Sequence, residues 1–481
     1  MGLQYSLTST PLAIGAYLGS VIGVGGSPVF IYGYILAVLC NLCVCVSLAE
    51  IAAVSPHTSG QIFWTAAMAP KKVARVLSYL CAWITSAAYF FLTAACSLLT
   101  SQLAWAVVQI IRTTFVVQPW HYYAGYVGST LFALALNVPF FKLYPYMLNG
   151  MVLYINLGAL FVFIVLLIRT HPKQSASFVF ADLVNNTGWS SNGVVFFLGL
   201  LPGATAVNCF EGAAHLADEM PEPKKNVPRV MVGSAVLSAI SGLPMILVYM
   251  FCNIKPDNLL DPIGGQPIAQ LLVDSLDSEA LVIVAVLIYL IAMLAATVCL
   301  LTGFSRTIWA VSLQNALPGS SFIAAVNSYY DLPVNSVVCG SVLTIAIGTI
   351  QLGSTTAINA VLGGGIVMCY LSYMIVLGCL LYCGRASVFP AKRFFNMGRS
   401  GILFNIISVV WMPFITTWLC FPSYLPVTGS TMNYASVVIG GVFLCAAINW
   451  FAYSKKRYTI PVAMAAGSRE PGEWSLEHGH E

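Results

Sequence analysis

The amino-acid sequence predicts an all-α polytopic membrane protein with about twelve transmembrane helices. Of its 481 residues, 59% are hydrophobic and only 7% are charged, and the mean hydropathy is +0.86. A water-soluble chain of this length would be roughly a quarter charged, whereas long uncharged apolar blocks indicate membrane spans. Apolar stretches of about 18 to 25 residues begin near residues 3, 29, 76, 122, 146, 191, 230, 281, 334, 357, 401 and 434.

The predicted transmembrane domain covers residues 1–457, and residues 458–481 form a short cytosolic tail. Only NVPFFKLYPYM (Asn137–Met147) separates the fourth and fifth spans, and its two prolines and Lys142 favour a short turn. The first apolar block begins without a charged segment, so no cleavable signal peptide is expected. The lack of a cytosolic stretch before Gly2 suggests a truncated gene model.

The basic residues predict the orientation of the spans. If the N-terminus is cytosolic, only four of the twenty Lys and Arg residues fall in outer connectors: Arg112, Arg169, Lys173 and Lys255. This bias predicts a multi-pass protein with cytosolic N- and C-termini. The sequon Asn185-Asn186-Thr187 falls in an outer connector, where a glycosylated asparagine is expected. No basic run alternates with aromatic residues, so nucleic acid is not an expected partner.

All fourteen cysteines lie within or beside apolar blocks, and we interpret them as packing residues. The spacing Cys40-Asn41-Leu42-Cys43 leaves a redox or zinc role as the alternative. No metal site and no cofactor are predicted.

Two spans are interrupted at comparable places, five spans apart. The first contains SLTSTPLAIGAYLG (Ser6–Gly19), and the sixth contains GLLPGATAVNCFEGAAHLADEM (Gly199–Met220). This pattern predicts two five-helix repeats of inverted topology, each beginning with a broken helix whose backbone lines a central cavity. The alternative is that Pro11 and Pro202 only kink packed helices.

A broken helix exposes N–H groups at one half-helix end and C=O groups at the other, so it suits a solute that carries both an anion and a cation. An amino acid is such a solute. The small and polar residues around the breaks are therefore candidates for substrate binding: Ser9, Thr10, Gly15, Gly203, Thr205 and Asn208.

Glu50 and Glu211 are the two acidic residues that the sequence places within apolar spans. Intramembrane carboxylates are unfavourable and usually face a cavity or a partner. Glu50 lies near the cytosolic end of the second span, where a structural or gating role such as capping the next connector is favoured. Glu211 has no such exit, and we predict that it contacts the substrate or the coupled proton.

Three segments resemble the signatures of the amino acid, polyamine and organocation permeases, and the fungal amino acid/choline/GABA permease branch most of all. They are Ser47–Trp64, Phe210–Met231 and Gly303–Asn327. The resemblance runs from about Gly2 to Arg457. It implies a twelve-helix transporter of the LeuT-like fold, with substrate held between the first, third, sixth, eighth and tenth spans.

In that family the sixth-span break reads roughly Gly-Tyr/Phe-Asp before a run of small residues and a His. The matching positions here are Cys209, Phe210 and Glu211, followed by Gly212–Ala214 and His215. The resemblance makes Phe210 a substrate-binding candidate. His215 is a candidate for relaying a proton, although a packed His is the alternative.

The aromatic run in AAYFFL falls where the third span would face the cavity. Tyr89 and Phe90 are candidates to close over a substrate or to face an ammonium, and core packing is the alternative. Hydroxyls on the eighth span, at Thr297, Thr302 and Ser305, lie where related sodium-coupled transporters hold a cation; bonds to their own backbone are the alternative. The fifth span carries Asn156 where some proton-coupled relatives have Lys.

Together these observations predict a secondary active transporter in the plasma membrane that imports GABA, another amino acid or choline. Its partners are a small-molecule substrate, the lipid bilayer and a coupling proton. The sequence contains no membrane-embedded metal cluster, GxSxG motif or paired catalytic carboxylates, so we do not expect an enzyme. A non-transporting nutrient sensor on the same fold is the alternative function.

Overall fold

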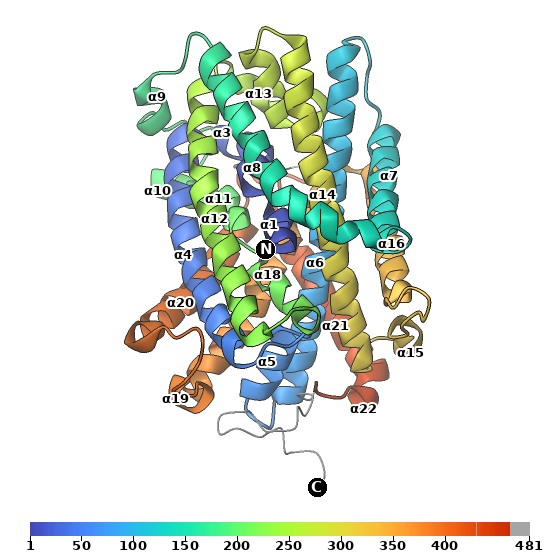
Figure 1. Ribbon diagram of the computed structural model, residues 1–481. Helices are drawn as coiled ribbons and strands as arrows, with labels where there is room; N and C mark the ends of the chain where they lie inside the picture. Colours follow the sequence, from blue (N-terminus) through green and yellow to red (C-terminus); the bar gives the residue numbers. More distant parts are fainter. Residues whose placement is uncertain (430, 462–481) are drawn as a thin grey trace.

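The computed structural model describes residues 1–429 and 431–461, and this part of the chain is a bundle of long helices (Figure 1). Ten helical stretches within it are long and apolar enough to cross a membrane. No strand is present among these residues; Asn327 and Leu332 form one isolated bridge. The predicted all-α membrane fold is confirmed, while the inverted repeat stays a prediction.

The helix boundaries follow the predicted spans closely, and the largest difference is at the seventh span, predicted from residue 230 and observed from Pro223. The long helices are α4 (Gly26–Val54), α6 (Ala74–Ile111), α7 (Pro119–Asn137), α8 (Tyr144–Arg169), α12 (Pro223–Cys252), α14 (Glu279–Leu313), α16 (Val334–Gly348), α18 (Thr355–Cys383), α20 (Gly401–Cys420) and α21 (Ala435–Asn449).

Short elements connect the long helices. They are α5 (Gln61–Met68), η2 (Phe141–Leu143), α9 (Ala176–Phe180), η4 (Pro256–Leu260), η5 (Ile263–Gly265), α13 (Pro267–Ser275), α15 (Ser320–Ile323), α17 (Ile350–Gly353), α19 (Arg385–Val388), η6 (Gly398–Ser400), the π-helical turn η7 (Trp450–Ser454) and α22 (Lys455–Arg457).

The first and sixth spans are both interrupted, as the sequence predicts. The first is divided into α1 (Gly2–Thr8), α2 (Thr10–Ala13), η1 (Ile14–Tyr17) and α3 (Leu18–Ile22). The sixth is divided into α10 (Asn192–Leu198), α11 (Leu201–Ala206) and η3 (Phe210–Glu219). Each break contains a non-glycine residue in the left-handed conformation, Ser9 with φ 42° and Cys209 with φ 52°. These residues redirect the chain and end the helical hydrogen bonding.

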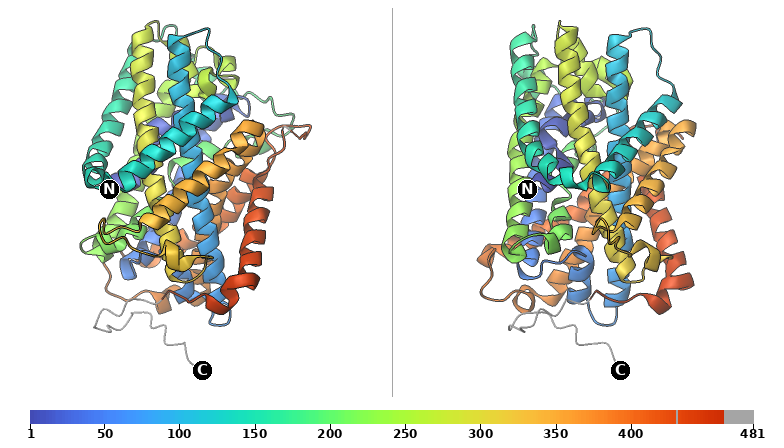
Figure 2. Two further views of the ribbon diagram at one scale, coloured as in Figure 1. Left: turned by 90° about the vertical axis from the view of Figure 1, so that its right-hand side faces the viewer. Right: turned by 45° about the vertical axis from the view of Figure 1, so that its right-hand side comes forward.

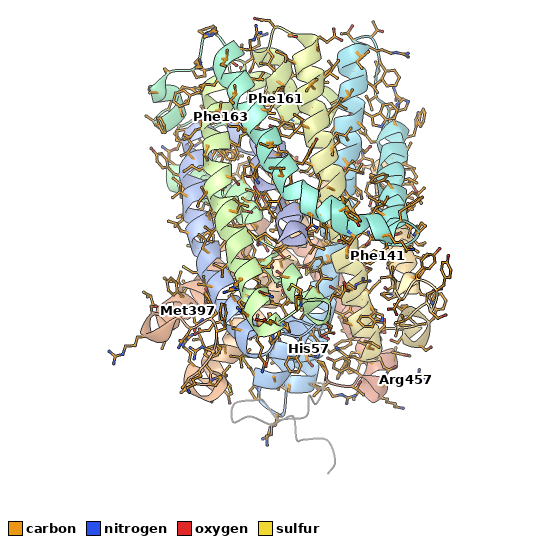
Figure 3. All side chains as sticks on the ribbon, viewed as in Figure 1. His57, Phe141, Phe161, Phe163, Met397 and Arg457 are labelled. Atoms are coloured by element: carbon orange, nitrogen blue, oxygen red, sulfur yellow. The ribbon has the colours of Figure 1, made fainter. Side chains whose placement is uncertain are left out.

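The two ends of the bundle carry different connectors. The short helices α9 and α13 lie at one end, and α5, α15, α19 and α22 lie at the other (Figure 1). Figure 3 places His57, Met397 and Arg457 at this second end, away from Phe161 and Phe163 of α8. The second end holds the cation-rich connectors predicted to be cytosolic.

Both chain termini were predicted to be cytosolic. The N-terminus, expected on the cytosolic side, lies at mid-height of the bundle (Figures 1 and 2). Most of the predicted tail, residues 462–481, lies outside the described residues.

The predicted turn between the fourth and fifth spans is formed by η2. Helices α7 and α16 both run obliquely across the long helices beside this turn (Figure 2). Tyr126 of α7 donates a hydrogen bond of 2.7 Å to the Thr344 carbonyl of α16, which joins the two oblique helices. They cover one side of α6 and α14, so the cavity-lining helices are enclosed by protein on that side.

Candidate substrate site

A cavity lies between the two helix breaks. Its wall comes from the first, third, sixth, eighth and tenth predicted spans, the same five that the resemblance implies. The lining residues are Leu7, Thr8, Thr10, Ala13, Ile14, Tyr17, Leu92, Ala95, Cys96, Leu99, Thr205, Ala206, Asn208, Cys209, Met293, Ala296, Leu300 and Ile366.

Side chains satisfy the backbone groups that the first break frees. Ser9 Oγ donates to the Ser6 carbonyl over 2.9 Å, and Tyr249 donates to the Pro11 carbonyl over 3.2 Å. Thr10 reaches the other break, because its hydroxyl donates to the Ala206 carbonyl over 2.6 Å. A buried carbonyl without a partner is unfavourable in a membrane, so these contacts stabilise the interrupted helices.

Two buried amides hold the sixth-span break. Asn41 of α4 donates to the carbonyls of Ala204 and Val207 over 3.2 and 2.9 Å. Gln4 of α1 donates to the Cys209 carbonyl over 2.5 Å, and its Oε1 accepts from the Ala213 N–H over 2.9 Å. These contacts hold Cys209 in a backbone conformation that favours glycine.

Sequence reasoning missed both amides, although an amide within an apolar run is a visible signal. Asn41 lies between Cys40 and Cys43, and the interpretation of this stretch rested on the two thiols instead of the amide.

Glu211 lies at the start of η3 with only 1% of its surface exposed. Its Oε1 accepts from the Tyr89 hydroxyl over 3.1 Å, and its Oε2 contacts the Tyr373 hydroxyl of α18. The same hydroxyl lies 3.0 Å from Asn208 Oδ1, and Asn208 lines the cavity. Glu211 itself is not a lining residue, so Tyr373 and Asn208 connect its carboxylate to the cavity.

No Lys or Arg forms an ion pair with Glu211 within the described residues. Tyr373 was not predicted as a site residue. Tyrosines are common in apolar spans, and nothing in the sequence shows which of them faces the site.

His215 follows Glu211 in η3. Its Nδ1 is 2.8 Å from the Thr58 carbonyl, and because a carbonyl only accepts, Nδ1 carries the hydrogen. Its Nε2 is buried without a hydrogen-bond partner in the structure, and the ring lies edge-on to Tyr89 with centroids 5.4 Å apart. His215 is thus packed close to Tyr89 and retains one ring nitrogen able to accept a proton.

The other predicted substrate residues divide into two groups. Thr10, Thr205 and Asn208 line the cavity, whereas Ser9 is bonded within its own break. Gly15 and Gly203 face neighbouring helices. A Cβ on Gly15 would approach Ile268 of α13 to 3.0 Å, and a Cβ on Gly203 would approach Ala37 Cβ of α4 to 2.8 Å.

The two predicted phenylalanines are packing residues in this structure. Phe90 stacks on Phe304 of α14 with centroids 5.4 Å apart, and Phe210 stacks on Tyr373 at 5.2 Å. Neither ring lines the cavity between the breaks.

Glu50, near the C-terminal end of α4, is fully buried and forms two ion pairs. Arg393 Nη2 lies 2.5 Å from its Oε1, and Arg385 Nη2 lies 2.7 Å from its Oε2. The Met397 N–H also donates to Oε1 over 3.1 Å. Glu50 therefore ties α4 to the connector between α18 and α20, rather than to the next connector along the chain as the sequence suggested.

The eighth-span hydroxyls bond their own helix. Thr297 donates to the Met293 carbonyl, Thr302 contacts the Val298 carbonyl, and Ser305 donates to the Thr302 carbonyl. Asn156 of α8 accepts from the Tyr5 hydroxyl of α1 over 3.1 Å. These contacts join the eighth-span hydroxyls to their own helix and join Asn156 to α1.

Comparison with known proteins gives consistent matches along the chain. The model of a family described as amino acid permease matches residues 3–444. The chain is 28% identical to a choline transporter of Saccharomyces cerevisiae over 477 residues, which cover 99% of this chain and 83% of the relative.

Two further fungal relatives match over similar lengths. A swainsonine transporter of Arthroderma benhamiae is 30% identical over 466 residues, covering 96% of this chain and 91% of the relative. Amino-acid permease 2 of Neurospora crassa is 27% identical over 442 residues, covering 91% and 80%. Each of these relatives is named as a transporter or a permease.

Proposed function

Since this chain belongs to the amino acid permease family and is a membrane transporter rather than an enzyme, we propose that it imports a small amine-bearing solute across the plasma membrane together with protons. The candidate solutes are GABA, another amino acid and choline, and the transport is secondary active. The observation that carries this proposal is the cavity between two broken helices, with the buried Glu211 connected to it through Tyr373 and Asn208.

The electrostatics of the site support a solute with positive charge. The carbonyl end of α11 faces the break, and the C-terminal end of a helix attracts cations. Glu211 lies just beyond this end and has two tyrosine hydroxyls as partners instead of a basic side chain. A buried carboxylate without a basic partner is stabilised by a nearby cation, so an ammonium group in the cavity complements the site.

The same group of residues supports coupling to protons. Tyr89 contacts both other groups, because its hydroxyl donates to Glu211 Oε1 and its ring lies edge-on to the His215 ring. A carboxylate and a neutral imidazole are groups that exchange protons in membrane transporters. We therefore propose that Glu211 takes up the coupled proton and that His215 receives it on the cytosolic side.

Uptake of labelled solutes by cells that express the full chain tests this function. The panel contains GABA, neutral and basic amino acids and choline, measured across pH and with sodium removed. We expect concentrative uptake of at least one amine, stimulated at acidic external pH and independent of sodium. Absence of uptake for every solute, with the protein shown at the cell surface, would contradict transport and favour the nutrient sensor.

A further inference from the structure

We infer that the transported solute is a small organic cation without a carboxylate. This inference rests on the proposed transport function and specifies the substrate class of the same cavity. The inference distinguishes amine alcohols and alkylated ammonium ions from amino acids. These solutes resemble one another in size and in positive charge, so the carboxylate is the group that decides between them. The argument depends on where a carboxylate would find hydrogen-bond donors.

The half-helix that starts at the first break offers few donors to an anion. Anions bind at helix N-termini through free backbone N–H groups. Here Pro11 has no N–H, and the N–H groups of Leu12 and Ala13 both donate to the Ser9 carbonyl, over 3.0 and 2.9 Å. Within the four residues of α2, the Thr10 backbone N–H is the one that remains to donate to a ligand.

Three N–H groups around the start of the half-helix at the sixth-span break already have acceptors. The Cys209 N–H donates to Asn208 Oδ1 over 2.6 Å, and the Gly212 N–H donates to the Cys209 carbonyl over 3.1 Å. The Ala213 N–H donates to Gln4 Oε1. The carboxylate at this helix end is that of Glu211, so a second carboxylate from a solute would meet a like charge.

The cavity wall supplies no basic side chain that could pair with a carboxylate. None of its eighteen lining residues is Lys, Arg or His. A carboxylate moved from water into this space would lose its hydration without gaining a charged or multiple N–H partner, which is strongly unfavourable. A positive charge meets the opposite situation, because Glu211 and the carbonyl end of α11 both lie beside the cavity.

The remaining wall suits an alkylated ammonium with a polar end. Apolar side chains from three helices, among them Leu99, Met293 and Ile366, can pack against methyl groups. A quaternary ammonium needs no hydrogen-bond acceptor, and the break carbonyls of Ala206, Val207 and Cys209 each already accept one hydrogen bond from a side chain. The hydroxyls of Thr10 and Thr205 can pair with a solute hydroxyl.

Two matched pairs of solutes test this inference on the full-length protein. Choline and glycine betaine share a trimethylammonium group and differ in a hydroxymethyl against a carboxylate; ethanolamine and glycine form the same pair without methyl groups. We measure uptake of each labelled solute and thermal stabilisation of the purified protein by each unlabelled solute. We expect apparent affinity for choline to exceed that for betaine by at least about 30-fold, the lower bound for leaving a buried charge unpaired.

The outcomes distinguish the inference from the function on which it rests. Uptake of betaine with an affinity equal to that of choline, or of glycine with an affinity equal to that of ethanolamine, would overturn the inference and leave the transport function intact. Failure of every solute to be taken up or to stabilise the surface-expressed protein would overturn both. Uptake and stabilisation by choline with neither effect from betaine supports the inference.

Discussion

The Tyr89 hydroxyl of α6 donates a hydrogen bond of 3.1 Å to Glu211 Oε1 at the start of η3. This contact joins the third span to the broken sixth span beside the cavity. Both residues are buried, and the Tyr89 ring also lies against His215. Any movement of the sixth-span break relative to α6 must therefore change the environment of the Glu211 carboxylate. This is the contact through which solute binding would reach the proposed proton transfer.

Replacement of Glu211 by Gln keeps the shape of the side chain and removes its charge. If the carboxylate attracts the solute's ammonium, we expect the apparent affinity to fall about 30-fold to a few thousand-fold. If it carries the proton, pH-driven accumulation should disappear while exchange of internal for external solute continues. Glu279→Gln, at the exposed outer end of α14, is the matched control. A Glu211→Gln transporter with unchanged affinity and pH dependence would refute both roles.

Tyr373→Phe removes the hydroxyl that connects Glu211 to Asn208. A hydrogen bond to a charged group contributes about 1.5–3 kcal/mol, so we expect a loss of about tenfold to a hundredfold in apparent affinity or in accumulation. Concentration dependence of uptake at several pH values measures the effect. Tyr382→Phe, on the same helix but 74% exposed, should be silent. Equal behaviour of the two variants would show that the Tyr373 hydroxyl has no part in transport.

Gly203→Leu should destabilise the fold rather than obstruct the cavity. Gly203 packs against α4, where a Cβ would lie 2.8 Å from both Tyr34 Cα and Ala37 Cβ. Overpacking of this kind costs about 1–3 kcal/mol, and backbone atoms cannot give way easily. We expect a lower thermal midpoint in detergent and less protein at the surface. Gly128→Leu on α7, where no atom lies within 4 Å, is the control. A fully stable but inactive Gly203→Leu protein would instead indicate a direct role in the cavity.

Glu50→Gln should weaken the end of the bundle that holds α5 and α19. It leaves Arg385 and Arg393, which are largely buried, without their shared carboxylate, and breaking a buried pair costs about 3–5 kcal/mol. Thermal unfolding of the purified protein measures this loss. Glu222→Gln removes an exposed pair with Lys225 and should change stability by no more than about 1 kcal/mol. Similar midpoints for the two variants would mean that the Glu50 cluster does not stabilise this end.

Glycosylation and protease protection test the predicted orientation. Asn185 is exposed and lies on the connector between α9 and α10, which the charge bias places outside. We expect a glycan that disappears in Asn185→Gln, seen as a shift in electrophoretic mobility. A C-terminal tag should resist extracellular protease in intact cells. Ready digestion of that tag would reverse the orientation assigned to every connector.

Much of the fold was predictable from the sequence because membrane spans depend on local composition. Runs of apolar residues determined where helices begin, and the prolines and small residues around Pro11 and Pro202 marked both breaks. Glu211 was recognisable as a candidate because a carboxylate in an apolar run is rare. These signals need no knowledge of how the helices pack.

The partners of those residues were decided by the tertiary structure. Gln4 contacts Cys209, Tyr373 contacts Glu211 and Arg393 contacts Glu50, across 205, 162 and 343 residues of chain. Each pairing depends on how far a helix is rotated and where it crosses its neighbour, which hydropathy does not encode. The same reason explains why Gly203 proved to be a packing glycine, while Tyr373, one of twenty-three tyrosines, proved to connect the buried carboxylate to the cavity.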